Sequence, residues 1–342
     1  MSSQKHSRFW ITCLVSFLLL MMIVFTSLTQ GSFQISVSEV VNTLLGFEND
    51  PAFKLVVFDF RLPRIVVAIL VGFGLGVSGN VLQGMARNEI ADPGILGINT
   101  GASAAIILFM FFFQGQLTDV GWSGAIMMPL FGWVGGLFTA LFIYFFSRKQ
   151  GQLDPQRLIL VGIAISAGLS ALILFVSLKM APQDFEMATI WIRGSVSNAN
   201  WLNIAMILPW LICCVPLIFH KATVLDLLQL GEEKAMGLGV AVEKEKIILL
   251  LSSIGVISAS VSISGSLVFV GLIAPHISRQ LIGRHHRYSL PVSGLMGMLL
   301  VVAADLIAKV IFAPAELPVG IVISIIGVPF FMYLLFKNFN KS

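Results

Sequence analysis

The sequence predicts an all-α integral membrane protein that crosses the bilayer about ten times. Hydrophobic residues make up 57% of its 342 residues and charged residues only 11%, whereas a soluble domain carries about 25% charged residues. The mean hydropathy is +0.94. The apolar residues also form runs of roughly 20, the length that spans a bilayer core. Residues 1–342 are therefore predicted to form a single transmembrane domain.

Ten apolar runs have the length and composition expected of membrane spans, although one of them is short. The first run follows a basic segment and has no small-residue cleavage site, so it is predicted to be a retained helix and not a signal peptide. The predicted spans are residues 9–28, 62–84, 94–113, 122–146, 157–178, 201–219, 247–264, 267–282 (the short one), 290–312 and 319–336.

The lysine and arginine residues fall unevenly around these spans. Ten spans place both termini on one side of the membrane, and 15 of the 21 basic residues fall on that side. Cytoplasmic loops are enriched in lysine and arginine, so both termini are predicted to be cytoplasmic. The net charge of +4 is modest and reflects this topology, so it is not interpreted as a signal for nucleic-acid binding.

One segment, residues 220–246, is highly charged although the spans on both sides of it are apolar. Its charges alternate with apolar residues at helical spacing, before and after a break at Gly231. These apolar residues are Leu225, Leu228, Leu230, Ala235 and Leu238. A solvated linker would not need them, so the segment, called the platform below, is predicted to form two short helices that dock a soluble cytosolic partner. The alternative is an ordinary interhelical loop.

Small residues recur at helical spacing within several spans. Gly132 and Gly136 form a GxxxG pair, and Gly162, Ser166 and Ser170 form a stripe on the span at residues 157–178. Small residues let helices pack closely in lipid, which is the simpler interpretation. The alternative for the stripe is that it lines a smooth translocation pathway.

Several kinds of chemistry have no motif in this sequence. It contains no GxxxxGK[ST] phosphate-binding loop and no HExxH metal motif. The three cysteines lie in apolar runs and predict neither a disulfide framework nor a metal site. Few ionisable residues fall within a span, the clearest being Asp305 with Lys309 four residues later, whereas ion-coupled transporters usually place more charge there. We therefore expect no catalytic or metal site, and a transporter driven by a separate ATPase.

Four blocks of sequence resemble the permease subunits of ABC importers for iron-siderophores, haem and cobalamin. They are RLPRIVVAILVGFGLGVSGNVLQGMARNEIADPGILGINTGAS (residues 61–103), LGEEKAMGLGV (230–240), SISGSLVFVGLIAPHISRQLIGRHHRYSLP (262–291) and AELPVGIVISIIGVPFF (315–331). The resemblance implies a vitamin B12 importer permease-like fold in a bacterial cytoplasmic membrane. It also implies a homo- or heterodimer of permeases, two cytosolic ATPase subunits that use ATP, and an extracellular or periplasmic substrate-binding protein. No cofactor is expected on this chain.

The resemblance also assigns roles to individual residues. The family's ATPase-coupling loop matches the platform, and the residues assigned to it are Leu230, Gly231, Glu232, Lys234, Ala235, Leu238 and Gly239. The family uses basic residues at the positions of Arg61, Arg64 and Lys309 to hold carboxylates of the binding protein. These three residues are expected at the outer surface, where the alternative role is snorkelling to lipid headgroups.

The resemblance favours a ferric siderophore as the cargo, with cobalamin or haem as the alternative within the family and an ion-coupled secondary transporter outside it. The sequence departs from the family at two points. Glu89 follows Asn88 where the family usually has proline, and Lys309 replaces the usual arginine. A lysine keeps the charge but loses the bidentate geometry of a guanidinium.

Overall fold

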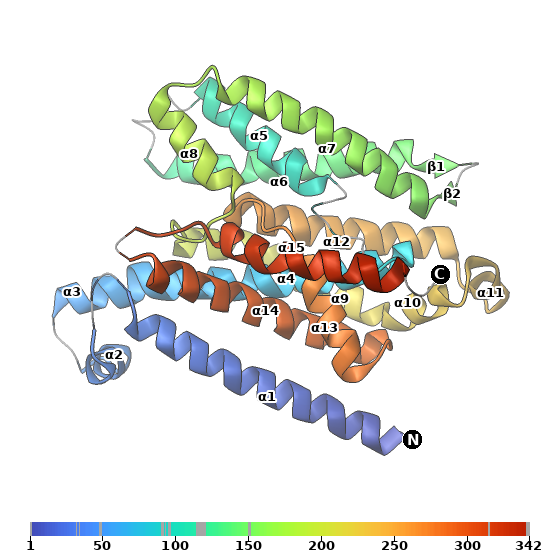
Figure 1. Cartoon of the computed structure of the whole chain (residues 1–342), viewed down its shortest axis with the longest axis horizontal. Coiled ribbons are helices and arrows are strands. Elements are labelled where there is room, and N and C mark those ends of the chain that lie inside the picture. Colours follow the sequence, from blue (N-terminus) through green and yellow to red (C-terminus); the bar gives the residue numbers. More distant parts are fainter. Residues whose placement is uncertain are drawn as a thin grey trace.

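The computed structural model describes residues 2–31, 33, 35–47, 50–89, 92, 94, 97–113, 121–149, 152–313 and 315–339, which are mostly helical (Figure 1). The first half contains α1 (Ser2–Thr29), α2 (Val37–Leu44), α3 (Pro51–Lys54), a π-helical segment (Leu55–Arg61), α4 (Leu62–Ala86), α5 (Ile98–Phe113), α6 (Gly121–Phe146) and α7 (Pro155–Ser177). The second half contains α8 (Pro182–Ile192), α9 (Trp201–His220), α10 (Ala222–Gln229), α11 (Glu232–Gly237), α12 (Val242–Ser264), α13 (Val270–Ile282), α14 (His286–Ile311) and α15 (Val319–Phe339). A two-residue hairpin, β1 (Arg148–Lys149) and β2 (Gln152–Leu153), joins α6 to α7.

Helix α4 is the centre of the bundle and packs against α9, α12, α13 and α14. Its glycines allow the backbones to touch. A Cβ atom on Gly72 would lie 2.4 Å from the carbonyl oxygen of Gly297 in α14, and one on Gly79 would lie 2.1 Å from that of Gly271 in α13. Both distances are shorter than a carbon–oxygen contact permits. The prediction that small residues serve close helix packing is confirmed at these positions.

The remaining helices are arranged around this core (Figure 1). Helices α5, α6, α7 and α8 form a group along one side, and α1 lies along the opposite side against α14. Helices α10 and α11 lie at one end of the molecule together with both chain termini, and this end is called the platform end below. Helices α2, α3 and α8 lie at the other end, called the opposite end.

Every predicted span contains a helix, but the helices differ in length. Among the described residues, eight helices are long and apolar enough to cross a membrane, and Ile98–Phe113 is a shorter apolar helix. The short span predicted at residues 267–282 corresponds to α13, which begins at Val270 and has 13 residues. Gly265 and Phe269 both have positive φ angles, 68° and 71°, which a continuous right-handed helix does not allow.

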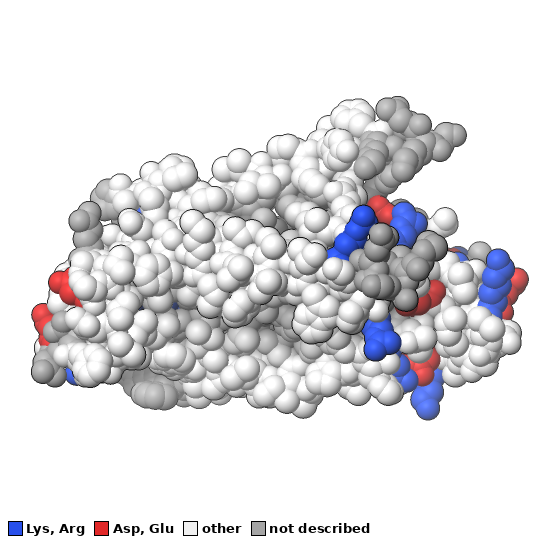
Figure 2. All heavy atoms as spheres, turned by 90° about the horizontal axis from the view of Figure 1, so that it is seen from below, with Lys and Arg blue, Asp and Glu red and all other residues white. Residues whose placement is uncertain are grey.

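The surface has the pattern expected of a membrane protein. In Figure 2 the charged side chains gather at the two ends, and an almost uncharged belt lies between them. Helices α7 and α15 contribute exposed aliphatic side chains to this surface, among them Leu160, Ile163 and Ile325. Such residues require lipid or another apolar protein surface around them.

Candidate functional site

The platform consists of two short helices joined at Gly231. Gly231 has a φ of 115°, a conformation that glycine adopts at low cost, and it separates α10 from α11. Leu225, Leu228 and Ala235 are fully buried against the rest of the chain. The prediction of two short helices on either side of Gly231 is confirmed.

The other predicted apolar residues of the platform face outward. Leu230 is 55% exposed and Leu238 is 62% exposed, and Met236, which the sequence analysis did not single out, is also exposed. Lys234 and Gly239 are exposed beside them. The platform is thus anchored by one set of apolar side chains and presents another, as a docking surface does.

Ion pairs connect the platform to two long helices. Glu232 of α11 accepts from Lys246 of α12 at 2.8 Å and from Arg87, which follows α4, at 3.3 Å. Lys221, just before α10, pairs with Glu245 of α12 at 2.8 Å. Lys246 is almost completely buried, and burial of an ion pair requires good geometry on both partners. These charges hold the platform in place within the chain.

A carboxylate–histidine contact connects α10 to α14. One oxygen of Asp226 accepts from the backbone nitrogen of His286 at 2.9 Å and lies 2.7 Å from its Nδ1. Burial raises the pKa of the Asp226 carboxyl, but the hydrogen bonds and charge of His286 outweigh this effect, so the pKa is lower than usual. The side chain of His286 is only 2% exposed, whereas that of His285 beside it is 63% exposed.

At the opposite end, the structure brings the three predicted docking residues to one region. Arg61 donates to the carbonyl oxygens of Leu28 and Phe33, and Lys309 donates to the carbonyl oxygen of Ser27 at 2.7 Å. Both side chains therefore bind the backbone around the end of α1. Basic groups satisfy the free carbonyl groups at the end of a helix in this way.

Arg64 forms ion pairs with two carboxylates of the same chain. It lies 2.8 Å from Asp305 of α14 and 2.7 Å from Glu316, which precedes α15. The Asp305 side chain is 2% exposed, whereas that of Glu316 is 35% exposed. The expectation that Arg61, Arg64 and Lys309 lie exposed on the surface is wrong, since all three are buried. Their part in docking stays a prediction.

A family model described as the FecCD transport family matches residues 19–337, almost the whole chain. The chain belongs to the FecCD transport family. It is 51% identical to the iron-uptake system permease protein FeuC of Bacillus subtilis, over 94% of this chain and 95% of that protein. It is 44% identical to the iron(3+)-hydroxamate import system permease protein FhuG of the same organism, over 97% of this chain and 98% of that protein.

A solved structure supports the same assignment. A metal-chelate type ABC transporter in an inward-facing conformation superposes with a TM-score of 0.80 at 31% identity, over 95% of this chain and 98% of that chain. The predicted all-α, vitamin B12 importer permease-like fold is confirmed. A FecCD permease is a membrane subunit without enzymatic activity, because the ATPase of the transporter is a separate subunit.

The small-residue stripe of this FecCD permease lies on α7. Gly162 is buried. A Cβ atom on Gly97, just before α5, would lie 3.0 Å from the carbonyl oxygen of Gly162 and 2.7 Å from the Oγ of Ser166. Ser170 is exposed. Gly162 and Ser166 therefore contribute to packing between α7 and the start of α5. A role for the stripe in lining a pathway stays a prediction.

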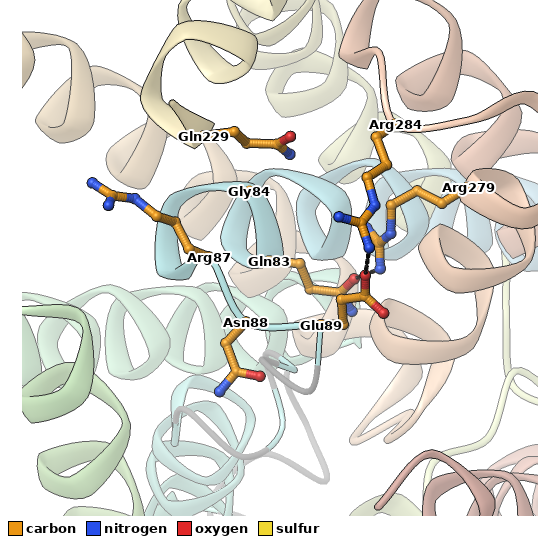
Figure 3. A pocket seen from close by; sticks show the side chains of 8 residues that line it. All are labelled: Gln83, Gly84, Arg87, Asn88, Glu89, Gln229, Arg279 and Arg284. Carbon is orange, nitrogen blue, oxygen red and sulfur yellow. Dashed lines mark hydrogen bonds and ion pairs between the residues drawn. The ribbon is translucent and has the colours of Figure 1, made fainter. Parts of the chain in front are cut away.

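A polar pocket of about 220 Å³ lies at the platform end (Figure 3). It is lined by Gln83, Gly84, Arg87, Asn88, Glu89, Gln229, Arg279 and Arg284. No sequence motif pointed to this pocket. These residues come from α4, α10, α13 and two connecting segments, so no local sequence pattern predicts their meeting. Among the described residues, no group of histidine, cysteine or carboxylate side chains could hold a metal ion.

Proposed function

We propose that this permease carries a ferric siderophore across the cytoplasmic membrane and forms one half of a dimeric translocation pathway. The relatives at 51% and 44% identity are named for iron uptake and for iron(3+)-hydroxamate import, and these names support an iron chelate as the cargo. The second permease is either another copy or a related chain. The exposed aliphatic side chains of α7 and α15 are suited to contact it or the surrounding lipid.

The exposed apolar surface of the platform is the observation that carries this function. Leu230, Met236 and Leu238 project from helices whose other faces are fixed to the bundle. A cytosolic ATPase subunit would cover these three side chains, and its movements would reach α4, α12 and α14 through the contacts of Glu232 and Asp226. On this proposal the platform and both termini are cytoplasmic.

At the opposite end we place the docking site of an extracellular or periplasmic binding protein. Of the three basic residues, Arg64 is the best placed for docking, because its partner Glu316 is a carboxylate that is 35% exposed, whereas the other two bind backbone carbonyl groups. A carboxylate of the binding protein would take the position of Glu316 on the guanidinium group. Arginine suits such an exchange because its planar fork donates two parallel hydrogen bonds.

Uptake of labelled chelates tests the proposed cargo. Cells that lack this gene and cells complemented with it would be given ferric hydroxamate, ferric catecholate, haem and cobalamin in turn. We expect complementation with the unmodified gene to restore uptake of a ferric siderophore. An Ala235→Pro variant, which breaks the buried turn of α11, should restore no uptake. Restored uptake of haem or cobalamin alone would refute the proposed cargo but leave the importer function intact.

Thiol labelling in intact cells tests the orientation. A Lys234→Cys variant should resist a membrane-impermeant reagent added from outside, because α11 would be cytoplasmic. A Ser38→Cys variant, exposed at the opposite end in α2, should react and serves as the matched control. Labelling of the Lys234→Cys variant from outside would overturn the topology.

A further inference from the structure

The pocket in Figure 3 contains more positive charge than its own carboxylate balances. Arg279, in the last turn of α13, and Arg284, just after α13, both point toward Gln83 and Glu89. Glu89 is the only carboxylate among the described lining residues, and it pairs with Arg284 at 3.0 Å. Glu89 also lies 3.8 Å from Nδ1 of His276. Its negative charge is thus shared between Arg284, His276 and, at longer range, Arg279.

Among the described residues Arg279 forms no ion pair of its own, and the charge of Glu89 reaches it only from beyond 4.0 Å. Its terminal nitrogen donates to the neutral amide oxygen of Gln83, and no described carboxylate lies within 4.0 Å of it. Its Nε is inaccessible and has no hydrogen-bond partner among the described residues. A guanidinium group withdrawn from water is costly unless an anion and further hydrogen bonds compensate it.

The backbone on the other side of the pocket is held in an unusual conformation. Arg87 ends α4 with a φ of 47°, in the left-handed region, where glycine or asparagine is usual. This turn directs Asn88 and Glu89 along the pocket, while the Arg87 side chain points away toward the platform (Figure 3). Glu89 thus has a fixed place beside the two arginines, where it competes with any anion that enters.

We infer that this pocket is a binding site for a phosphate group, held by Arg279 and Arg284. Two guanidinium groups that converge on a cavity of about 220 Å³ match the several acceptor oxygens of a phosphate. The phosphate could belong to an anionic lipid headgroup or be free in the cytosol. In Figure 2 charged side chains border the almost uncharged belt, a position suited to contact with lipid headgroups. Arg284 is 75% exposed, so both sources can reach it.

The site has a consequence for the neighbouring platform. Gln229, the last residue of α10, lines the same pocket, and Arg87 binds Glu232 of α11. A bound phosphate would therefore hold α13 and the segment after α4 together, directly beside the two helices of the platform. This inference stands on the pocket alone and does not depend on the identity of the transported cargo.

The test uses the assembled transporter, with its permeases and ATPase subunits, in two arms. In the first, equilibrium binding of labelled inorganic phosphate is measured in detergent. In the second, native mass spectrometry counts lipids retained from phosphatidylcholine vesicles with or without phosphatidylglycerol. Saturable binding in the first arm identifies free phosphate, and selective retention of phosphatidylglycerol in the second identifies a lipid.

Three variants make either result specific. Arg279→Gln should weaken binding by at least about tenfold, the loss expected for one charge-assisted contact. Glu89→Gln should strengthen it by a few-fold, because it removes the competing carboxylate. Arg287→Gln, an exposed arginine that does not line the pocket, should leave binding unchanged. Thermal unfolding of each variant without ligand verifies that it is folded.

Two outcomes would overturn the proposal. One is the absence of saturable binding in both arms. The other is binding that Arg279→Gln and Arg287→Gln reduce equally, since that would reflect general attraction of anions to the basic rim. If Arg279→Gln unfolds the protein, Arg279→Lys replaces it. This variant keeps the charge but loses the fork, so an unchanged phosphate affinity in Arg279→Lys would also contradict a guanidinium site.

Discussion

At the platform end, ion pairs connect helices to one another and leave apolar side chains of α11 exposed, whereas at the opposite end the basic residues are buried among partners of the same chain. Glu232 joins α11 to α12 and to the end of α4. Arg61 and Lys309 instead bind backbone carbonyls near the end of α1. The first arrangement leaves a surface free for a partner. The second requires a partner to compete with internal contacts.

The largest effect is expected from breaking the buried ion pair of Arg64. An Asp305→Ala variant leaves the guanidinium group without its most buried partner, and removal of one member of a buried pair costs about 3–5 kcal/mol. Glu316→Gln is the matched control, since this carboxylate is more exposed and should cost about 0–1 kcal/mol. Thermal unfolding of the purified protein measures both. Equal losses of stability in the two variants would show that burial does not determine how much each ion pair contributes.

The next effect concerns the exposed apolar surface of the platform. A Leu238→Asp variant should reduce assembly with the ATPase subunit by about tenfold or more, because truncation of a central apolar contact costs about 2 kcal/mol. Leu238 has no internal packing role, so the stability of the isolated permease should not change. Co-purification with the ATPase subunit measures assembly, and Glu233→Gln, another exposed residue of α11, is the control. Normal assembly of the Leu238→Asp variant would show that the platform is not part of the interface with the ATPase subunit.

The sequence predicted the platform end better than the opposite end. Helical spacing and a glycine break are local signals, so the division of the platform at Gly231 could be predicted. Hydropathy likewise located the spans, although not the late start of α13, which depends on two positive φ angles. The resemblance to a known family supplied roles for residues, but it did not supply their contacts.

Contacts between distant segments could not be predicted in this way. Arg64 and Asp305 are separated by 241 residues, and Lys309 and Ser27 by 282. Asp305 and Lys309 lie four residues apart on one helix, yet the ion pair of Asp305 is with Arg64. On the predicted topology Arg61, Arg64 and Lys309 lie on the outer side of the membrane, as an exception to the positive-inside rule. Their burial accounts for the exception, because that rule concerns charges in loops.

A smaller effect would sharpen the comparison at the opposite end. If the carboxylate of a binding protein replaces Glu316 on Arg64, then Glu316→Gln removes a competitor and should tighten docking by roughly two- to fivefold, in line with about 0.5–1 kcal/mol for an exposed pair. Surface plasmon resonance with the loaded binding protein measures this affinity. Reversal of Arg64 to glutamate is a poor test, because it would place a third carboxylate beside Asp305 and Glu316. An unchanged affinity in Glu316→Gln would assign Arg64 a structural role only.

The smallest effect is expected at the contact between α10 and α14. The folded-state pKa of Asp226 is lower than the ordinary pKa of an aspartate, so the contact stabilises the fold fully above about pH 5 and is lost as the pH falls through the folded pKa. An Asp226→Asn variant should therefore be less stable than the unmodified chain near neutral pH. The difference should shrink as the pH falls from about 5 toward 3. Thermal unfolding across this pH range measures the stability of Asp226→Asn and of the unmodified chain. The stability of the control variant Glu233→Gln, at an exposed position, should change with pH in parallel with that of the unmodified chain. If the curves for Asp226→Asn and the unmodified chain stay parallel as well, the carboxylate of Asp226 does not carry the link from the platform to α14, and the ion pairs of Glu232 and Lys221 would connect the platform to the bundle.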